Sequence, residues 1–387
     1  MKGSSFFRLK RPQRQGGFGL IEIMLGLALG LLVVLGVVKI YASWDARQRN
    51  VGAKNDAQMV ASIAVHALEQ DIRMAGRGFG SADPAALGCS ITAFVAPATP
   101  QSVTFPLVPL LITDGAAGAP DQITVLHGNS AIRVINDYVV DSTATSKTVL
   151  NRGGFLAGDK VLLTNSKESP VACALVEITN RSTTDQVSFS HLTTAYTSGY
   201  AAADSTELAM PTMNTDAGTG TANFNGGLIH NLGPVPQLNL WALTSPATQP
   251  SVWTLSRTNR LPMNSADTSP YEVAEGIVNL QAQYGYDANN DGMLANNEWI
   301  DPSAMPTPII WSQVLAVRFG ILARSAHYEP LPYRAVQPFW EGGNFVMTDL
   351  SGGVDSDSAG ANNWRSYRYQ VLEAVVPLRN YLQQWRD

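Results

Sequence analysis

The stretch that decides the fold is GGFGLIE at residues 16–22, because it opens a long apolar run. Residues 18–38 read FGLIEIMLGLALGLLVVLGVV and carry a single charge, Glu22. A helix needs about 20 mainly apolar residues to cross a bilayer, and this run meets that requirement. We therefore expect one membrane-spanning helix near the N-terminus.

The segment before the apolar run is basic. Residues 1–17 contain lysines and arginines but no acid, whereas the whole chain has a net charge of −5 and a pI near 5.6. A basic flank stays in the cytoplasm, so we expect the rest of the chain in the periplasm of a Gram-negative cell. A secretory signal would place a small-residue cleavage site after the apolar region, and Lys39 to Trp44 do not supply one. The natural boundary lies between Gly17 and Phe18.

The order Gly17-Phe18-Gly-Leu-Ile-Glu22 behind a short basic leader resembles the signal of type IV prepilins and of type II secretion pseudopilins. The resemblance implies that a prepilin peptidase removes residues 1–17 by cutting between Gly17 and Phe18, and that Phe18 is then N-methylated. Glu22 would become the fifth residue of the mature chain. In these families this glutamate is thought to pair with the N-terminal amine of a neighbouring subunit, which offsets two costly charges in an apolar bundle. The alternative is a glutamate at the membrane interface that reaches toward the lipid head groups.

Helical spacing continues beyond the membrane. Apolar residues recur three or four positions apart, as on one face of a helix: they are Val60, Ile63/Ala64, Ala67/Leu68, Ile72 and Ala75. Gly76, Gly78 and Gly80 end this pattern. The spacing predicts an amphipathic stem over residues 39–78, which continues the membrane half formed by residues 18–38.

The remainder, residues 79–387, predicts a large, mostly antiparallel β head. Short runs rich in β-forming residues alternate there with glycine, proline, asparagine and aspartate. The expected strands cover residues 103–108, 122–127, 132–140, 160–164, 171–178, 186–190, 237–243, 252–256, 275–286, 313–323 and 367–376. Residues 192–227 are rich in threonine, alanine, glycine and serine, and we expect a surface loop or insertion. The fold class is therefore α+β, with a long N-terminal helix on a β head.

Several segments resemble the PilW-type minor pilins of type IV pili, in the same order along the chain. These segments are Asp71 to Gly76, Gly88-Cys89, Asp121 to Val125, Gly276 to Leu280 with Tyr284 to Asp287, Val317 to Arg324, and Val375 to Asn380. The resemblance implies a pilin-like fold and a minor pilin that primes pilus assembly at the inner membrane. It also implies other minor pilins and the major pilin as partners, a place at or near the tip of the fimbrium, and a part in twitching motility. Lys39 stands where many major pilins carry a proline, which argues against a major subunit.

Two other functions share these features. A large pseudopilin of a type II secretion system has the same leader and stem, and an adhesin head displayed on a pilus is also compatible with the sequence. We expect no enzyme, because the sequence contains no nucleophile elbow, Walker loop or dinucleotide fingerprint. The acidic balance and the lack of arginine-rich patches give no electrostatic footprint for nucleic acid.

The sharpest chemical motif of the head is DANNDGMLANNE at residues 287–298, which fits the calcium-loop pattern D-x-[DN]-x-[DN]-G-x5-E at every fixed position. The oxygen donors it offers to Ca²⁺, the one cofactor we expect, are Asp287, Asn289, Asp291, the carbonyl of Met293, and Glu298. The run before the motif reads as a strand, so the loop would sit in a β setting. Asn-Asp-Gly is also typical of a hairpin turn, and the sequence leaves both interpretations open.

The chain has two cysteines, Cys89 and Cys173. Two are too few for a disulfide scaffold, and their spacing is not that of a zinc site. An oxidising periplasm would favour a bridge between them, which would tether the exit of the stem to the sheet. Two buried free thiols are the alternative.

Overall fold

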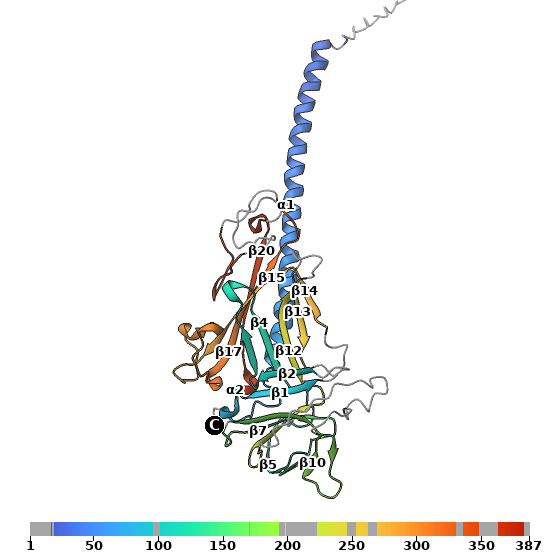
Figure 1. Cartoon of the computed structure of the whole chain (residues 1–387). Helices are drawn as coiled ribbons and strands as arrows, with labels where there is room; N and C mark the ends of the chain where they lie inside the picture. The colour runs from blue at the N-terminus through green and yellow to red at the C-terminus, as the bar shows by residue number, and fades with distance from the viewer. Residues whose placement is uncertain are drawn as a thin grey trace, which may run out of the picture. The chain divides into compact units, whose positions relative to one another are not determined.

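The computed structural model describes residue 17 and residues 19–95, 101–169, 171–192, 198, 223–245, 253–261, 269–329, 336–347 and 363–382 (Figure 1). The chain divides into two compact units, residues 1–52 and residues 53–387. Helix α1, Leu20–Met74, contributes to both units.

In the first unit, the described part of α1 carries an exposed apolar surface. Leu20–Asp45 is long and apolar enough to cross a membrane, with a mean hydropathy of 2.6, and none of it is buried in the protein. This segment supports the expected N-terminal membrane anchor. The apolar window extends past Val38, where the sequence-based boundary was placed.

The second unit is built from strands, short helical turns and the end of α1. Its strands are β1 (Ser90–Val95), β2 (Gln101–Pro106), β3 (Leu110–Thr113), β4 (Gln122–His127), β5 (Asp137–Ser142), β6 (Ser146–Val149), β7 (Lys160–Asn165), β8 (Ala172–Glu177), β9 (Asn180–Arg181), β10 (Ser188–Ser190), β11 (Leu228–Gly233), β12 (Gln237–Thr244), β13 (Thr254–Asn259), β14 (Tyr271–Glu275), β15 (Ile277–Tyr286), β16 (Trp299–Ile300), β17 (Val314–Arg324), β18 (Phe339–Trp340), β19 (Gly343–Asn344) and β20 (Tyr369–Pro377). Its helical turns are η1 (Pro84–Ala86), η2 (Ala116–Gly118), η5 (Asn296–Glu298), η6 (Pro302–Ala304), η7 (Trp311–Gln313), η9 (Trp364–Ser366) and α2 (Arg379–Leu382).

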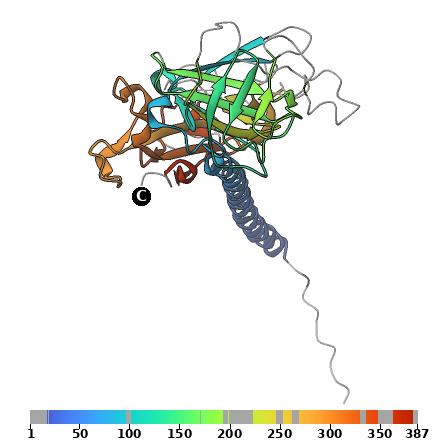
Figure 2. The same ribbon diagram turned by 90° about the horizontal axis from the view of Figure 1, so that it is seen from below.

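Every strand pairing among the described residues is antiparallel. The larger sheets have the orders β8-β7-β11-β5-β6-β10-β9, β14-β13-β12-β4-β3 and β16-β15-β17-β20, and β1-β2 and β18-β19 form small pairs. Figure 2 shows these strands from below. The predicted α+β fold, with an N-terminal helix and a mostly antiparallel β region, is confirmed.

Residues 53–74 of α1 pack against the five-stranded and four-stranded sheets. The buried stripe of the helix recurs every three or four residues, as expected for one helical face: it is Ala57, Ala61, Ala64, Leu68 and Ile72. Trp241, Tyr284 and Phe319 from the sheets belong to the same core. Because three of the five stripe residues are alanines, the helix can approach the sheets closely.

Two glycines turn the chain sharply after the helix. Gly76 adopts a φ of 78°, in the left-handed region that commonly ends helices, and its N–H donates to the carbonyl of Leu126 at 2.9 Å. At Gly80, a Cβ atom would lie 1.9 Å from the carbonyl oxygen of Asn380. Only glycine allows this approach of the C-terminal segment to the end of the stem.

The seven-stranded sheet lies at one end of the second unit and has a core of its own (Figure 1). Val139, Phe155 and Phe189 are among the buried residues of that core. Cys89, which follows η1, forms a disulfide with Cys173 on β8, and their Cα atoms lie 6.3 Å apart. The bridge links the chain after the stem to an end strand of this sheet.

The sequence-based strand over residues 132–140 is wrong in its first half, because β5 begins at Asp137. Residues 132–136 form a loop instead. Arg133 donates to the carbonyls of Ile135 at 3.1 Å and of Asn151 and Gly153 at 2.8 Å each. These side-chain bonds hold the loop and leave Ile135 72% exposed. Most of the expected loop at residues 192–227 lies outside the described residues.

Asp121 joins two of the sheets. Its carboxylate accepts the N–H of Gly115 at 2.8 Å, before β4, and the N–H of Ala282 at 2.7 Å, on β15. Burial raises the pKa of Asp121 from 3.8 to about 7, which the two backbone bonds oppose and the charges of Asp114 and Asp301 reinforce. The carboxyl is therefore easier to protonate in the native state than in the unfolded chain.

This shift predicts a pH-dependent stability. Between pH 3.8 and about 7, unfolding releases the proton that native Asp121 holds, so stability falls as the pH rises through this window and stays lower above it. The slope contributed by one such group is at most about 1.4 kcal/mol per pH unit. Thermal melting of the full chain in detergent from pH 5 to pH 9 should show this slope, and Asp121→Asn should flatten it. Equal slopes for the two proteins would contradict the assignment.

Candidate functional site

The N-terminal processing and assembly residues lie at the start of α1. Gly17 is exposed, and a Cβ built on it would meet nothing within 4 Å, while Phe18 lies outside the described residues. Glu22 occupies the first turn of the helix, and its N–H donates to the carbonyl of Gly19 at 2.9 Å. The positive end of the helix dipole favours a carboxylate at this position. An exposed glycine therefore lies just before a helix with an acidic first turn.

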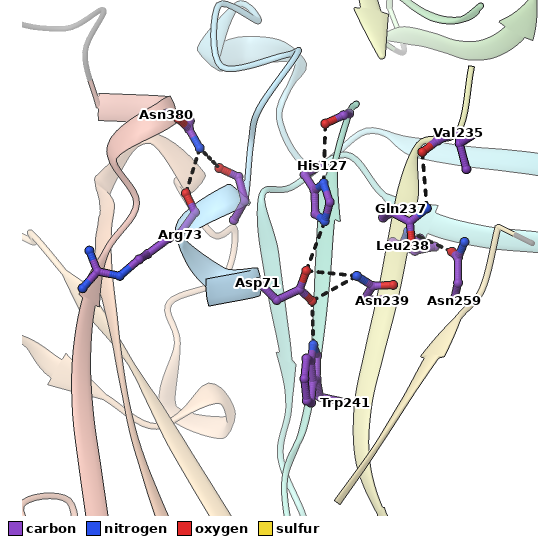
Figure 3. A network of polar contacts seen from close by, with 12 residues as sticks. Asp71, Arg73, His127, Val235, Gln237, Leu238, Asn239, Trp241, Asn259 and Asn380 are labelled. Carbon is purple, nitrogen blue, oxygen red and sulfur yellow. Dashed lines mark hydrogen bonds and ion pairs between the residues drawn. The ribbon is translucent and has the colours of Figure 1, made fainter. Parts of the chain in front are cut away.

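In the second unit, Asp71, at the end of α1, lies at the centre of a network of polar contacts (Figure 3). Its Oδ1 accepts a hydrogen bond from Nδ2 of Asn239 at 3.0 Å and lies 3.1 Å from Nε2 of His127. Its Oδ2 accepts from the indole Nε1 of Trp241 at 2.6 Å and from Asn239 at 3.1 Å. One helical carboxylate is thus bonded to β4 through His127 and to β12 through Asn239 and Trp241.

The surroundings of Asp71 make these bonds strong. Asp71 is 8% exposed, Asn239 is 2% exposed and Trp241 is 1% exposed. A carboxylate taken out of water loses several kcal/mol of hydration, which only good hydrogen bonds or a charged partner can offset. Bonds to a charged group contribute about 1.5–3 kcal/mol each. The arrangement fixes the end of α1 against both strands.

A second contact holds the same end of the helix. Nδ2 of Asn380, in α2, donates to the carbonyl of Arg73 at 2.9 Å and to the carbonyl of Ala75 at 3.2 Å (Figure 3). The last carbonyls of a helix have no partner within it, and this amide supplies one from the C-terminal segment. We call Asp71, His127, Asn239, Trp241 and Asn380 the helix-to-head joint.

The sequence analysis placed Asp71 and Asn380 in family-like segments but gave neither residue a role. The partners of Asp71 lie 56 to 170 residues away along the chain. No local spacing could have connected them. The usable signal was an aspartate inside an otherwise apolar helical stripe, which requires a buried partner.

The calcium-type loop has the shape of a tight turn. The N–H groups of Asp291 and Gly292 donate to the carboxylate of Asp287 at 3.1 and 2.7 Å, and Nδ2 of Asn289 donates to Asp291 at 2.9 Å. Asn290 and Gly292 have positive φ values of 58° and 78°. The structure therefore brings Asp287, Asn289 and Asp291 into one turn.

Glu298 does not complete this group. Its Oε2 accepts the N–H of Ala295 at 2.7 Å, within η5. Among the residues that the structure describes, no three His, Cys, Asp or Glu side chains are close enough together to hold a metal ion. Met293, whose carbonyl was the fourth expected ligand, has its side chain 68% exposed. The calcium site stays a prediction.

The helix-to-head joint generates a stability test. Asp71→Ala would leave the buried indole of Trp241 and the amide of Asn239 without their acceptor, and we expect a loss of about 3–5 kcal/mol. The matched control is Glu69→Ala on the same helix, because Glu69 forms an exposed pair with Arg73 and its removal should cost under about 0.5 kcal/mol. Denaturant unfolding of the full chain in detergent measures both. Similar losses for the two variants would contradict the role of the joint.

Comparison with known proteins adds one finding. Residues 243–380, which contain β13 to β20 and Asn380, match the family model PilW, described as type IV pilus-assembly protein W. Neither the comparison with curated proteins nor the comparison with solved structures gives a match. The family match supports involvement in type IV pilus assembly and association with its machinery. It confirms the sequence-based resemblance to PilW-type pilus proteins over these residues.

Proposed function

We propose that this chain is a minor pilin that primes type IV pilus assembly at the inner membrane and is incorporated at or near the pilus tip. The observation that carries the proposal is the PilW match over residues 243–380 on a chain that begins with an apolar helix. The head would face the periplasm before incorporation. Interaction with other subunits, and not catalysis, is the activity that these features favour.

In this proposal, cleavage between Gly17 and Phe18 prepares the helix for assembly. The cut creates a positively charged amine at Phe18, and Glu22 lies four residues later, in the first turn of α1. In an apolar bundle, a lone carboxylate is costly. Pairing with the amine of a neighbouring subunit removes that cost, so Glu22 would select a correctly processed neighbour.

The test is deletion of the gene followed by complementation with full-length variants. We expect the deletion to abolish surface pili and twitching, and Glu22→Ala to fail to restore them, because breaking a buried charge pair costs about 3–5 kcal/mol. Gly17→Ala should accumulate as an unprocessed precursor. Ser43→Ala, a change in the same helix, should restore pili and serves as the control.

Other outcomes separate the alternatives. Pili that persist in the deletion strain would contradict an assembly role. If that strain retains pili but fails to secrete proteins, the chain acts as a pseudopilin. If pili are normal but attachment to a surface is lost, the head acts as an adhesin.

We also propose that residues 287–298 bind Ca²⁺. The support is the complete sequence motif and the turn that gathers Asp287, Asn289 and Asp291. A carboxylate oxygen that accepts one N–H still has a lone pair for another partner. These residues therefore fit a hard cation. Glu298 would have to release the N–H of Ala295 to join them.

Calcium titration of the full chain in detergent tests this proposal. Bound Ca²⁺ should raise the melting temperature, with about 2.7 kcal/mol of stabilisation at 100 times the dissociation constant. Asp291→Ala should abolish the effect, whereas Asp301→Asn, just outside the loop, should keep it. No rise with the unaltered chain would remove the calcium proposal.

A further inference from the structure

Strand β20 (Tyr369–Pro377) forms one end of the four-stranded sheet. Among the described strands it pairs with β17 alone, in a regular register from Ala316 opposite Pro377 to Arg324 opposite Tyr369, without a bulge. Among the described strands that end a sheet of four or more strands, β20 is the longest, with 9 residues. Its outer edge is therefore the longest strand edge in these sheets that no other described strand pairs with.

Two backbone hydrogen bonds, one at each end of the β17–β20 pair, show which backbone groups point outward. The N–H of Ser325 donates to the carbonyl of Arg368, and the N–H of Leu378 donates to the carbonyl of Leu315. In an antiparallel pair, the bonded positions alternate along the strand. The even-numbered residues of β20 thus bond β17, while Val371, Glu373 and Val375 direct their N–H and C=O groups away from it.

These outward groups have almost no partner in the described part of the chain. No hydrogen bond from the N–H of Val371, Glu373 or Val375 is found there. The carbonyl of Val371 accepts only Nε2 of Gln370, at 3.2 Å. An open row of this kind is a template for pairing with another chain.

Other end strands are better protected. On β3, the N–H of Ile112 donates to the hydroxyl of Tyr284 at 2.5 Å. Strand β14 is shorter, carries Glu272 and Glu275, and has a register shift against β13. Strand β20 carries one such charge, Glu373, but it has no register shift and no described partner for the N–H groups of Val371, Glu373 and Val375.

The side chains beside the edge of β20 are partly exposed and apolar, so an added strand could bury them. Leu372 and Ala374 pack against the main core but remain partly exposed, and Val375 is 57% exposed. A groove of about 750 Å³ lies at the start of the strand, lined by Val371, Phe339 and Lys54 among others. An added strand with apolar side chains would bury this surface.

The charges on the edge indicate what the added strand carries. Glu373 is exposed, and it and Glu341 both face Arg318, whose Nη1 lies 3.9 Å from Glu341. Two carboxylates against one guanidinium leave an excess of negative charge. A second copy of this chain, paired along the full length of β20, would place Glu373 opposite Glu373, and like charges in that position are destabilising.

We propose that the edge of β20 binds an extended strand of another pilus subunit by main-chain hydrogen bonding. That strand presents apolar side chains beside Leu372 and Ala374 and a basic side chain opposite Glu373. The inference deepens the proposed function and rests on it for the class of the partner. The geometry of the edge itself does not depend on that function.

The first test is photo-crosslinking in cells that produce the full chain. A photoreactive residue at Val375 should crosslink to another protein, at a peptide that contains a basic residue within an alternating apolar segment. The same photoreactive residue at Ile135, which is 72% exposed near the seven-stranded sheet, should not capture that protein and is the matched control. Crosslinks only between two copies of this chain, or none at Val375, would overturn the proposal.

The second test removes a single outward N–H. Val375→Pro deletes a donor that makes no bond to β17, and proline is tolerated at such edge positions, so the variant should melt within a few degrees of the unaltered chain. It should lower co-purification of the crosslinked partner at least tenfold, whereas Val375→Ala should not. Undiminished co-purification by a folded Val375→Pro chain would overturn the proposal.

The outcomes of these tests are distinct from those for the assembly role. If gene deletion leaves pili intact while Val375→Pro still disrupts the complex, the edge binds a strand but the assembly function fails. If Glu22→Ala abolishes pili while Val375→Pro changes neither the complex nor piliation, the assembly function holds and the edge proposal fails. The N-terminal sequence of the captured partner shows whether it is a pilin.

Discussion

The buried carboxylate of Asp71 fixes how α1 meets the sheets. The apolar stripe of the helix consists largely of alanines, such as Ala57 and Ala61, which bury little surface and contact their neighbours without directional preference. Rotation or sliding of such a stripe is opposed only weakly. Asp71, in contrast, must meet the donors of Asn239 and Trp241 at hydrogen-bond distance. This directional contact sets both the position of the helix along its axis and its rotation about that axis.

The same contact makes the fold of the head cooperative. The donors to Asp71 come from β4 and β12, and the amide that caps the helix end comes from Asn380, 307 residues after Arg73. These bonds join residues that lie 56 to 307 positions apart. Contacts of such long range require loop closure before they form. The polar contacts at the end of α1 therefore depend on the folded sheets and on the docked C-terminal segment.

How far the sequence predicts the fold depends on where each side chain finds its partner. The expected strand at residues 122–127 coincides with β4, because its alternation of apolar and polar residues is local. Strand β11, which contains His230, Asn231 and Gly233, was not among the expected strands. Both polar side chains are nonetheless buried, and Nδ2 of Asn231 bonds the carboxylate of Asp159 at 2.8 Å. In β11, contacts with distant segments therefore determine the secondary structure more strongly than the amino-acid composition of the strand does.

The candidate sites follow the same physical rule. The processing signal around Gly17 and Glu22 is a short contiguous motif, so the sequence alone could propose it. The helix-to-head joint depends on contacts between residues far apart in the chain. Only part of the joint lies within the PilW match: Asn380 is inside residues 243–380, while Asp71 and Trp241 are outside. The matched part alone therefore cannot fix the stem. The seven-stranded sheet, with its separate core, supplies none of the five residues of the joint, so changes there can alter the head without loosening the helix.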